Sequence, residues 1–290
     1  MQKLACLSIG LLLVFALMPS LSAAQNATTF VNDPPVVEPE VWRAIETNAD
    51  TPLRVIVVLR PAGTAVTIPT AATANVASRT LLVETLQENL RSALEPVETL
   101  LAEAQNRGDV LARQDLWIIH ATALTARPAF VHRLMTSPAV AEIRLDHDVQ
   151  YVLPNESATP ENVPSTEPTW GVTRIRAPEV WATLGISGTG AVVAIMDTGV
   201  DLLHPALNAN YRGNLGRGLY DHTHSWYDVV NGVYPYDDNG HGTHVAGTAA
   251  GTGNIGVAPA AQWIGVKVLS GEGYGYNAWI HAGFQWLLAP

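Results

Sequence analysis

The hydrophobic positions in the first half of the chain change repeatedly between strand and helix spacing. A run that is apolar except for Arg54 predicts a buried strand over residues 53–59. Leucines and valines then recur every three or four residues from 82 to 101, which predicts a helix that Pro96 should kink or break. The remaining runs predict a strand, a short helix and another strand over residues 116–124, 129–135 and 140–145. Residues 51–153 should therefore form a small α+β domain.

A different pattern follows in the second half. Residues 154–168 contain several prolines among polar residues and have no apolar periodicity, so we predict a linker. Residues 191–196 and 262–269 then read as near-continuous apolar strands, with helices between and after them. Strands that are apolar on both faces are typical of a parallel sheet covered by helices. We therefore predict a doubly wound α/β domain over residues 169–290.

The first 24 residues have the pattern of an export signal. Lys3 precedes an apolar run over residues 4–18, and small residues follow it, with cleavage predicted after Ala24. The run is shorter than the roughly 20 residues that a membrane span needs. We therefore expect a secreted protein that has no membrane association after cleavage, in which residues 25–50 form a poorly ordered leader. Cys6 is the only cysteine and precedes the cleavage point, so the mature protein should contain no disulfide bond.

The composition and net charge of the chain limit the classes of partner that it is expected to bind. The chain contains 48% hydrophobic and 14% charged residues, which is enough apolar material for packed cores. Its formal net charge is -10. Proteins that bind nucleic acid instead gather Lys and Arg, because these displace counterions from the phosphates. We therefore expect no nucleic-acid partner.

The first candidate for chemistry is Asp197, in the sequence Val-Ala-Ile-Met-Asp-Thr-Gly over residues 193–199. It lies where a buried strand should reach its carboxyl end, and ligands and catalytic groups collect at that edge of a parallel sheet. Gly199 permits a tight turn, so the carboxylate can be held in one orientation. A single Asp-Thr-Gly is weak evidence, because any strand end can carry an aspartate.

The second motif, residues 237–251, reads Asp-Asp-Asn-Gly-His-Gly-Thr-His-Val-Ala-Gly-Thr-Ala-Ala-Gly. An Asp or Asn at its start can cap a helix, and the small residues let that helix approach a sheet closely. His241 then lies in the first turn, where the positive end of the helix dipole disfavours a charged imidazolium. A neutral imidazole can accept a proton, and it needs an anion to orient it. Asp197 is the candidate for that anion.

Together the two motifs resemble the Asp and His motifs of the subtilisin-like serine peptidase family (peptidase S8). The resemblance covers residues 170–290, and residues 170–181 are most similar to the bacillopeptidase F type. It implies a secreted serine endopeptidase that acts on protein or peptide substrates. Asp197 corresponds to the orienting aspartate, His241 to the general base, and His244 to a structural residue. In this family a serine attacks the scissile carbonyl while the histidine takes its proton.

The resemblance also implies roles for two further segments. Residues 51–153 resemble an inhibitor I9-like propeptide, a ferredoxin-like α+β domain that acts as an intramolecular inhibitor of its own enzyme. Gly273, Tyr274 and Gly275 correspond to the cleft strand, to which a substrate peptide adds as a further β-strand. Without the resemblance, an ordinary glycine-rich loop would explain residues 271–275 equally well.

The sequence departs from the family pattern in two places. Members with a high-affinity calcium site carry an Asp shortly after a His-Pro pair, where this chain has Ala206. We therefore expect that site to be absent and no cofactor to be required, although structural calcium elsewhere stays open. No serine in the chain lies in the family's Gly-Thr-Ser motif. We therefore expect a C-terminally truncated catalytic domain whose nucleophile lies beyond Pro290, and no peptidase activity from this chain alone.

Three alternative functions compete with this interpretation. Aspartic peptidases also use Asp-Thr-Gly, but they need two such carboxylates and the chain has one motif. A catalytic metal could use His241, His244 and the nearby His222 and His224, but no Glu follows the first histidine and no third ligand is evident. The third alternative is a binding or inhibitory protein, in which residues 51–153 inhibit a peptidase and the α/β part is inert.

Overall fold

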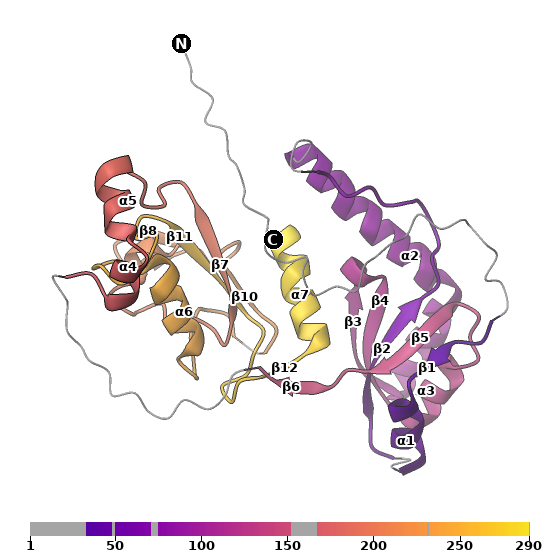
Figure 1. Ribbon diagram of the computed structural model, residues 1–290. Helices are drawn as coiled ribbons and strands as arrows, with labels where there is room; N and C mark the ends of the chain where they lie inside the picture. Colours follow the sequence, from indigo (N-terminus) through magenta and orange to yellow (C-terminus); the bar gives the residue numbers. More distant parts are fainter. Residues whose placement is uncertain (1–32, 48–49, 71–74, 152–166, 231, 290) are drawn as a thin grey trace. The chain divides into compact units, whose positions relative to one another are not determined.

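The structure, a computed structural model, describes residues 33–47, 50–70, 75–151, 167–230 and 232–289. The predicted signal peptide and nearly all of the predicted linker lie outside these residues, so both stay predictions. Helices and strands mix along the described chain in two groups (Figure 1), which agrees with the mixed α/β class predicted. None of the described helices combines the length and hydrophobicity that crossing a bilayer requires.

A mainly antiparallel sheet with strand order β1-β5-β2-β4-β3 organises the first group. Strand β2 pairs antiparallel with both β4 and β5, whereas β1 adds to the edge in parallel with β5. One helix follows β2 and another follows β4, which is the split βαβ order of ferredoxin-like folds. The elements are β1 Val36–Val37, α1 Pro39–Thr47, β2 Leu53–Leu59, α2 Val76–Arg107, β3 Val110–Leu116, the 3₁₀ turn η2 Trp117–Ile119, β4 Ala121–Ala126, α3 Pro128–Leu134, β5 Val140–Leu145 and β6 Asp148–Gln150.

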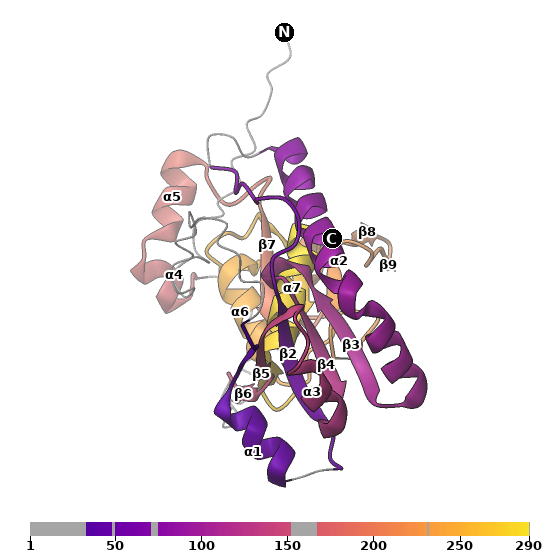
Figure 2. The same cartoon turned by 90° about the vertical axis from the view of Figure 1, so that its right-hand side faces the viewer.

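Alternate residues of β2 belong to different cores. Val55 and Val57 contribute to the main buried cluster with side chains of α2 and α3. Figures 1 and 2 show the ribbon of this sheet and the helices α2 and α3 that belong to the same group. Ile56 belongs to a second cluster, which includes Ala278 of helix α7 (Asn277–Leu288). The apolar run over residues 53–59 follows from this arrangement, because a strand with apolar neighbours on both faces has no polar face.

Three parallel strands in the order β10-β11-β7 form the sheet of the second group. Ile195 and Trp263 pack with α6 in one cluster, whereas Met196 and Val266 pack with α7 in another. Helices therefore lie on both faces of the sheet, as in doubly wound α/β folds. The elements before α7 are α4 Trp170–Arg174, α5 Ala177–Leu184, β7 Val192–Asp197, the 3₁₀ turn η3 Asn208–Asn210, β8 Asn214–Gly216, β9 Leu219–Tyr220, β10 Trp226–Asp228, α6 His241–Ala250, β11 Gln262–Lys267 and β12 Tyr274–Tyr276.

Three predictions about the first group are wrong in detail. Helix α2 continues through Pro96, so the predicted break is wrong, whereas the alternative of a kink stays a prediction. Because Pro96 lies on an exposed turn, water can satisfy the carbonyl that loses its partner. Residues 116–124 are not one strand, because the chain reverses at His120, which has a φ of 57°. The predicted leader is not irregular throughout. It forms β1 and α1, and Val41 of α1 is fully buried in the main core.

Candidate active site

Asp197 is the last residue of β7, at the carboxyl edge of the parallel sheet. Its side chain is 11% exposed, and one carboxylate oxygen accepts the backbone N–H of Thr198 at 2.7 Å. The backbone carbonyl of Asp197 in turn accepts the N–H groups of Val268 and Leu269. The carboxylate is therefore held in one place at the edge where ligands collect in such sheets.

Two glycines allow the segment that carries the histidine to approach Asp197. Gly199 has a φ of +118°, and a Cβ there would lie 2.0 Å from the carbonyl oxygen of Tyr236. In the first turn of α6, a Cβ on Gly242 would lie 2.0 Å from the carbonyl oxygen of Gly199. The two sequence motifs therefore require glycine at these positions because their backbones are in contact.

His241 is the first residue of α6, and its ring faces Asp197. Ring atom Nδ1 lies 2.8 Å from Asp197 Oδ1 and 3.0 Å from Oδ2. The sequence prediction that these two side chains meet is therefore confirmed as geometry. The histidine side chain is 41% exposed. Because Nδ1 carries the proton when it donates to a carboxylate, Nε2 is left with a lone pair that can accept a proton.

Asp237 organises the loop that precedes α6. Its carboxylate accepts the backbone N–H groups of Asn239, Gly240 and Thr243 and the hydroxyls of Thr198 and Thr243. Burial favours a higher pKa for Asp237, but the hydrogen bonds from Thr243, Gly240 and Asn239 outweigh it and hold the pKa below its ordinary value. The N-cap residue is Gly240, not the Asp or Asn that the sequence predicts, because Asp237 reaches the N–H of Thr243 from outside the helix.

Lys267 is a charged residue close to this pair that the sequence interpretation missed. It lies directly opposite Asp197 in the β7–β11 ladder, and its side chain is completely buried. Its ammonium group donates to Asp238 Oδ1 at 2.7 Å. The signal in the sequence is a lysine inside the apolar run 262–269, because a buried ammonium needs partners from nearby segments.

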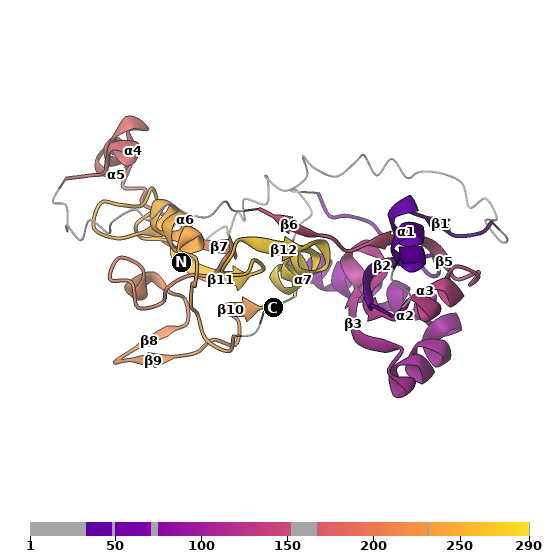
Figure 3. The same ribbon diagram turned by 90° about the horizontal axis from the view of Figure 1, so that it is seen from below.

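The three residues predicted to bind substrate, Gly273, Tyr274 and Gly275, lie in or next to β12. Strand β12 pairs antiparallel with β6 (Figure 3), and Gly275 lies opposite Val149. The backbone N–H of Tyr151 extends this pairing by donating to the carbonyl of Gly273 at 2.9 Å. This edge therefore receives an extended segment of the same chain, in the way that a peptide adds to a sheet edge.

The geometry gives no support to the metal alternative. Within the described part of the chain, no group of three or more His, Cys, Asp or Glu side chains is placed to hold a metal ion. His244 is exposed on α6, and His222 pairs through Nδ1 with the hydroxyl of Tyr211 at 2.9 Å. The expectations about calcium stay predictions. The aspartic-peptidase alternative is not favoured either, because the partner of Asp197 is a histidine.

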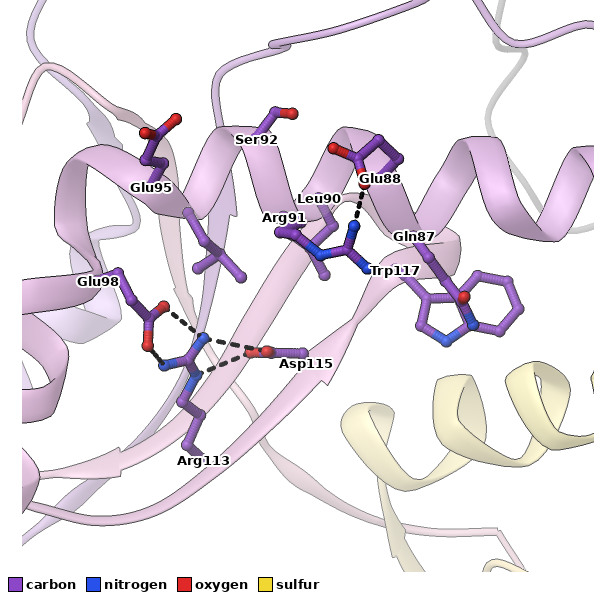
Figure 4. Close-up of a pocket in the computed structure, with 11 residues that line it drawn as sticks. Gln87, Glu88, Leu90, Arg91, Ser92, Glu95, Glu98, Arg113, Asp115 and Trp117 are labelled. Carbon is purple, nitrogen blue, oxygen red and sulfur yellow. Dashed lines mark hydrogen bonds and ion pairs between the residues drawn. The ribbon is translucent and has the colours of Figure 1, made fainter.

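A cavity of about 580 Å³ lies away from these residues, between α2 and β3 (Figure 4). Its lining comes entirely from residues 87–117. Arg113, which is 14% exposed, donates to both Glu98 and Asp115, and Arg91 pairs with Glu88. Because both arginines of the lining are already paired with carboxylates and neither Asp197 nor His241 lines the cavity, we assign it no part in their chemistry.

Comparison with known proteins adds to this geometry. Residues 188–289 match the model of the subtilase family, Peptidase S8. The chain is 35% identical over 234 residues to Bacillopeptidase F of Bacillus subtilis (strain 168), covering 73% of this chain and 16% of that protein. It is 42% identical over 121 residues to the Major intracellular serine protease of the same organism, covering 40% of this chain and 35% of that protein. A solved cold adapted subtilisin-like serine proteinase is 33% identical, with a TM-score of 0.29, over 35% of this chain and 33% of that chain.

The family match concerns the part of the chain that holds the site. Asp197, His241 and β12 all lie within the segment that matches the subtilase family. That segment is therefore similar in sequence to subtilisin-like serine peptidases. The chain spans well under half the length of both curated relatives.

Proposed function

We propose that this chain provides the aspartate and histidine of a serine endopeptidase of the subtilase type, which hydrolyses peptide bonds in proteins. The observation that carries the proposal is the 2.8 Å contact between Asp197 and His241, within a segment that matches the family. We further propose that the protein is exported, because residues 1–24 have the pattern of a signal peptide. A similar protein named as intracellular shows that the family resemblance alone does not decide the compartment.

The chemistry follows from the orientation of the imidazole. Asp197 holds the Nδ1 proton, so Nε2 takes the hydroxyl proton of a serine as that oxygen attacks the peptide carbonyl. The carboxylate of Asp197 stabilises the imidazolium that forms. Nε2 then gives its proton to the leaving amine, which leaves an acyl-enzyme. Water repeats the sequence by giving a proton to Nε2, attacking the ester and releasing the acid and the serine hydroxyl.

The serine is the group that still has to be supplied. No serine in residues 1–290 lies in a Gly-Thr-Ser motif, and no hydroxyl in the described part of the chain hydrogen bonds to Nε2 of His241. We propose that the nucleophile is encoded after Pro290 and that the 290-residue chain alone does not hydrolyse protein. In subtilisin, loss of the serine costs about 10⁶-fold in kcat, which would leave no measurable turnover.

The test is expression of the complete reading frame that contains these residues, with His241→Ala as the matched variant. We expect casein hydrolysis and labelling by a fluorophosphonate probe, and a loss of about 10⁶-fold in kcat in the variant. The 290-residue chain should show neither property. The proposal fails if the complete product hydrolyses casein equally well with alanine at 241, or if the 290-residue chain is labelled in a way that depends on His241.

We also propose that residues 51–153 act as an inhibitor of the same enzyme, together with β1 and α1, which join the same sheet and core. Support comes from the pairing of β6 with β12 and from the bond between the N–H of Tyr151 and the carbonyl of Gly273. A segment that occupies this edge competes with a substrate for the same main-chain hydrogen bonds. Substrates would therefore reach the site only after β6 leaves.

The inhibitor proposal can be tested with residues 34–153 added to Bacillopeptidase F. We expect inhibition at micromolar concentration. Tyr151→Pro removes one main-chain donor and should weaken inhibition at least about tenfold, whereas Tyr151→Phe keeps the donor and should stay within about twofold. If the wild-type segment does not inhibit at these concentrations, or if the two variants behave alike, the role of this strand has been misassigned.

A further inference from the structure

Lys267 carries its charge inside the protein. It is the last residue of β11, its side chain is 0% exposed, and it lies directly across the ladder from Asp197. An ammonium in such a place is costly unless all of its protons are hydrogen-bonded. The reaction described above gives this lysine no proton to move. The free-energy cost of burying its charge therefore has to be explained by the groups to which its ammonium donates hydrogen bonds.

The ammonium group has three acceptors, which is the full number that a lysine can use. It donates to the backbone carbonyl of Thr198, to Asp238 Oδ1 at 2.7 Å and to the backbone carbonyl of Leu269 at 2.9 Å. These acceptors come from three separate segments. The first follows Asp197 in the chain, the second belongs to the loop that ends at His241, and the third begins the segment that leads to β12.

Other contacts bind the same segments together at their edges. The side-chain amide of Asn239 donates to the carbonyl of Gly271 at 2.8 Å, which ties the histidine loop to the segment before β12. The centre of the Tyr236 ring lies 4.9 Å from the ammonium nitrogen. Lys267 is the group at the centre, because it alone among these side chains contacts the Asp197 turn, the histidine loop and the segment before β12.

We propose that Lys267 is a positioning residue, which holds the loop carrying His241 against the turn carrying Asp197 and so keeps the Nδ1–carboxylate hydrogen bond in place. The bond to Asp238 is the connection to the loop, and the bond to the Thr198 carbonyl is the connection to the turn. The importance of the hydrogen bond between His241 and Asp197 for catalysis rests on the proposed function. The hydrogen bond itself can be measured without any hydrolysis.

The experiment is proton NMR of the 290-residue chain labelled with ¹⁵N. A histidine ring N–H that is hydrogen-bonded to a carboxylate gives a resonance downfield of the backbone amides, and His241→Gln identifies it by its disappearance. Lys267→Met keeps most of the side-chain volume and removes the charge. We expect this variant to lose the downfield resonance while its circular dichroism spectrum remains that of the wild type. A folded Lys267→Met protein whose resonance has an unchanged shift and exchange rate would overturn the proposal.

A second pair of variants decides the question if Lys267→Met does not fold. The side chain of Asp238 is 49% exposed, so its removal leaves no buried void. We expect Asp238→Ala to raise the exchange rate of the His241 ring proton with water at least tenfold. Asp238→Asn retains an oxygen acceptor and should raise that rate less than threefold. Equal rates in both variants and the wild type would show that the lysine contributes to stability only. Failure of the hydrolysis assay would leave all of these outcomes unchanged, so the two proposals can fail separately.

Discussion

The carboxylate of Asp146 accepts the backbone N–H of Ala278 at 3.0 Å, across 132 residues of sequence. Helix α7 has no side chain of its own on its first N–H groups, so this carboxylate acts as its cap. The other oxygen of Asp146 binds Arg54 at 3.0 Å, and the guanidinium of Arg54 lies 3.6 Å from the centre of the Tyr276 ring. One buried carboxylate therefore connects the antiparallel sheet with the helix that follows β12.

Asp146→Ala should destabilise the chain by about 2–4 kcal/mol, because it removes a helix cap and leaves a partly buried arginine without its partner. Urea unfolding followed by circular dichroism measures the difference. Asp148→Ala, two residues further on, is the matched control, because Asp148 is exposed. The control should change the free energy of unfolding by less than about 0.5 kcal/mol. Equal changes in the free energy of unfolding for the two substitutions would contradict the role of Asp146 as the cap of α7.

Two glycines of α6 should respond to alanine in opposite ways. In Gly242→Ala the new Cβ would lie 2.0 Å from the carbonyl oxygen of Gly199, so the turn after Asp197 must move, at a cost of at least about 2 kcal/mol. In Gly247→Ala the nearest atom is Ile255 Cγ2 at 3.9 Å. Alanine should there be neutral or stabilising by up to about 1 kcal/mol, because it favours the helix. Thermal unfolding of both variants provides the measurement.

Asp237 makes the stability of the α6 loop depend on acid. Its pKa in the folded protein lies below the ordinary value of 3.8. The ionised carboxylate therefore contributes stability that is fully present above pH 3.8 and is lost as the pH falls through the lowered pKa. Asp237→Asn should cost about 1–3 kcal/mol near neutral pH. Urea unfolding at a series of pH values should show that cost shrinking below pH 3.8, and a constant difference would refute the assignment.

His281 of α7 should make stability fall in the same direction, toward acid, but at a milder pH than Asp237. Burial lowers its pKa below 6.5, the charge of Arg144 lowers it further, and the carbonyl of Asn277 and the charge of Asp146 act against this. The folded protein therefore holds His281 neutral, and stability is lost as the pH falls from 6.5 through the lowered pKa. His281→Gln should reduce the fall in urea midpoint between about pH 7 and pH 5. A slope identical to that of the wild type would exclude this histidine as the cause.

Local sequence patterns predicted the elements whose ends coincide with a change from apolar to polar residues or proline. Strands β2 and β5 have the predicted bounds, 53–59 and 140–145, because each apolar run ends close to a proline or a charged residue. The meeting of Asp197 with His241 was also predicted, from a carboxylate at the carboxyl end of a strand and a neutral imidazole that needs an anion to orient it. The prediction of one strand over residues 116–124 is wrong because the apolar residues continue through the reversal of the chain at His120.

Long-range partners could not be predicted in the same way. The cap of α7 is Asp146, which nothing in the sequence near residue 277 reveals. Lys267 was visible as a charge within an apolar run, yet its acceptors belong to three segments whose proximity depends on the sheet.

The pairing of β6 with β12 joins two strands of one continuous chain. If β6 is an inhibitor, its effective concentration at β12 is set by the length of the connecting chain. Occupancy then does not depend on how much protein is present. Cleavage of the chain between β6 and α4 would make the same contact bimolecular, so that dilution after export would itself release the strand.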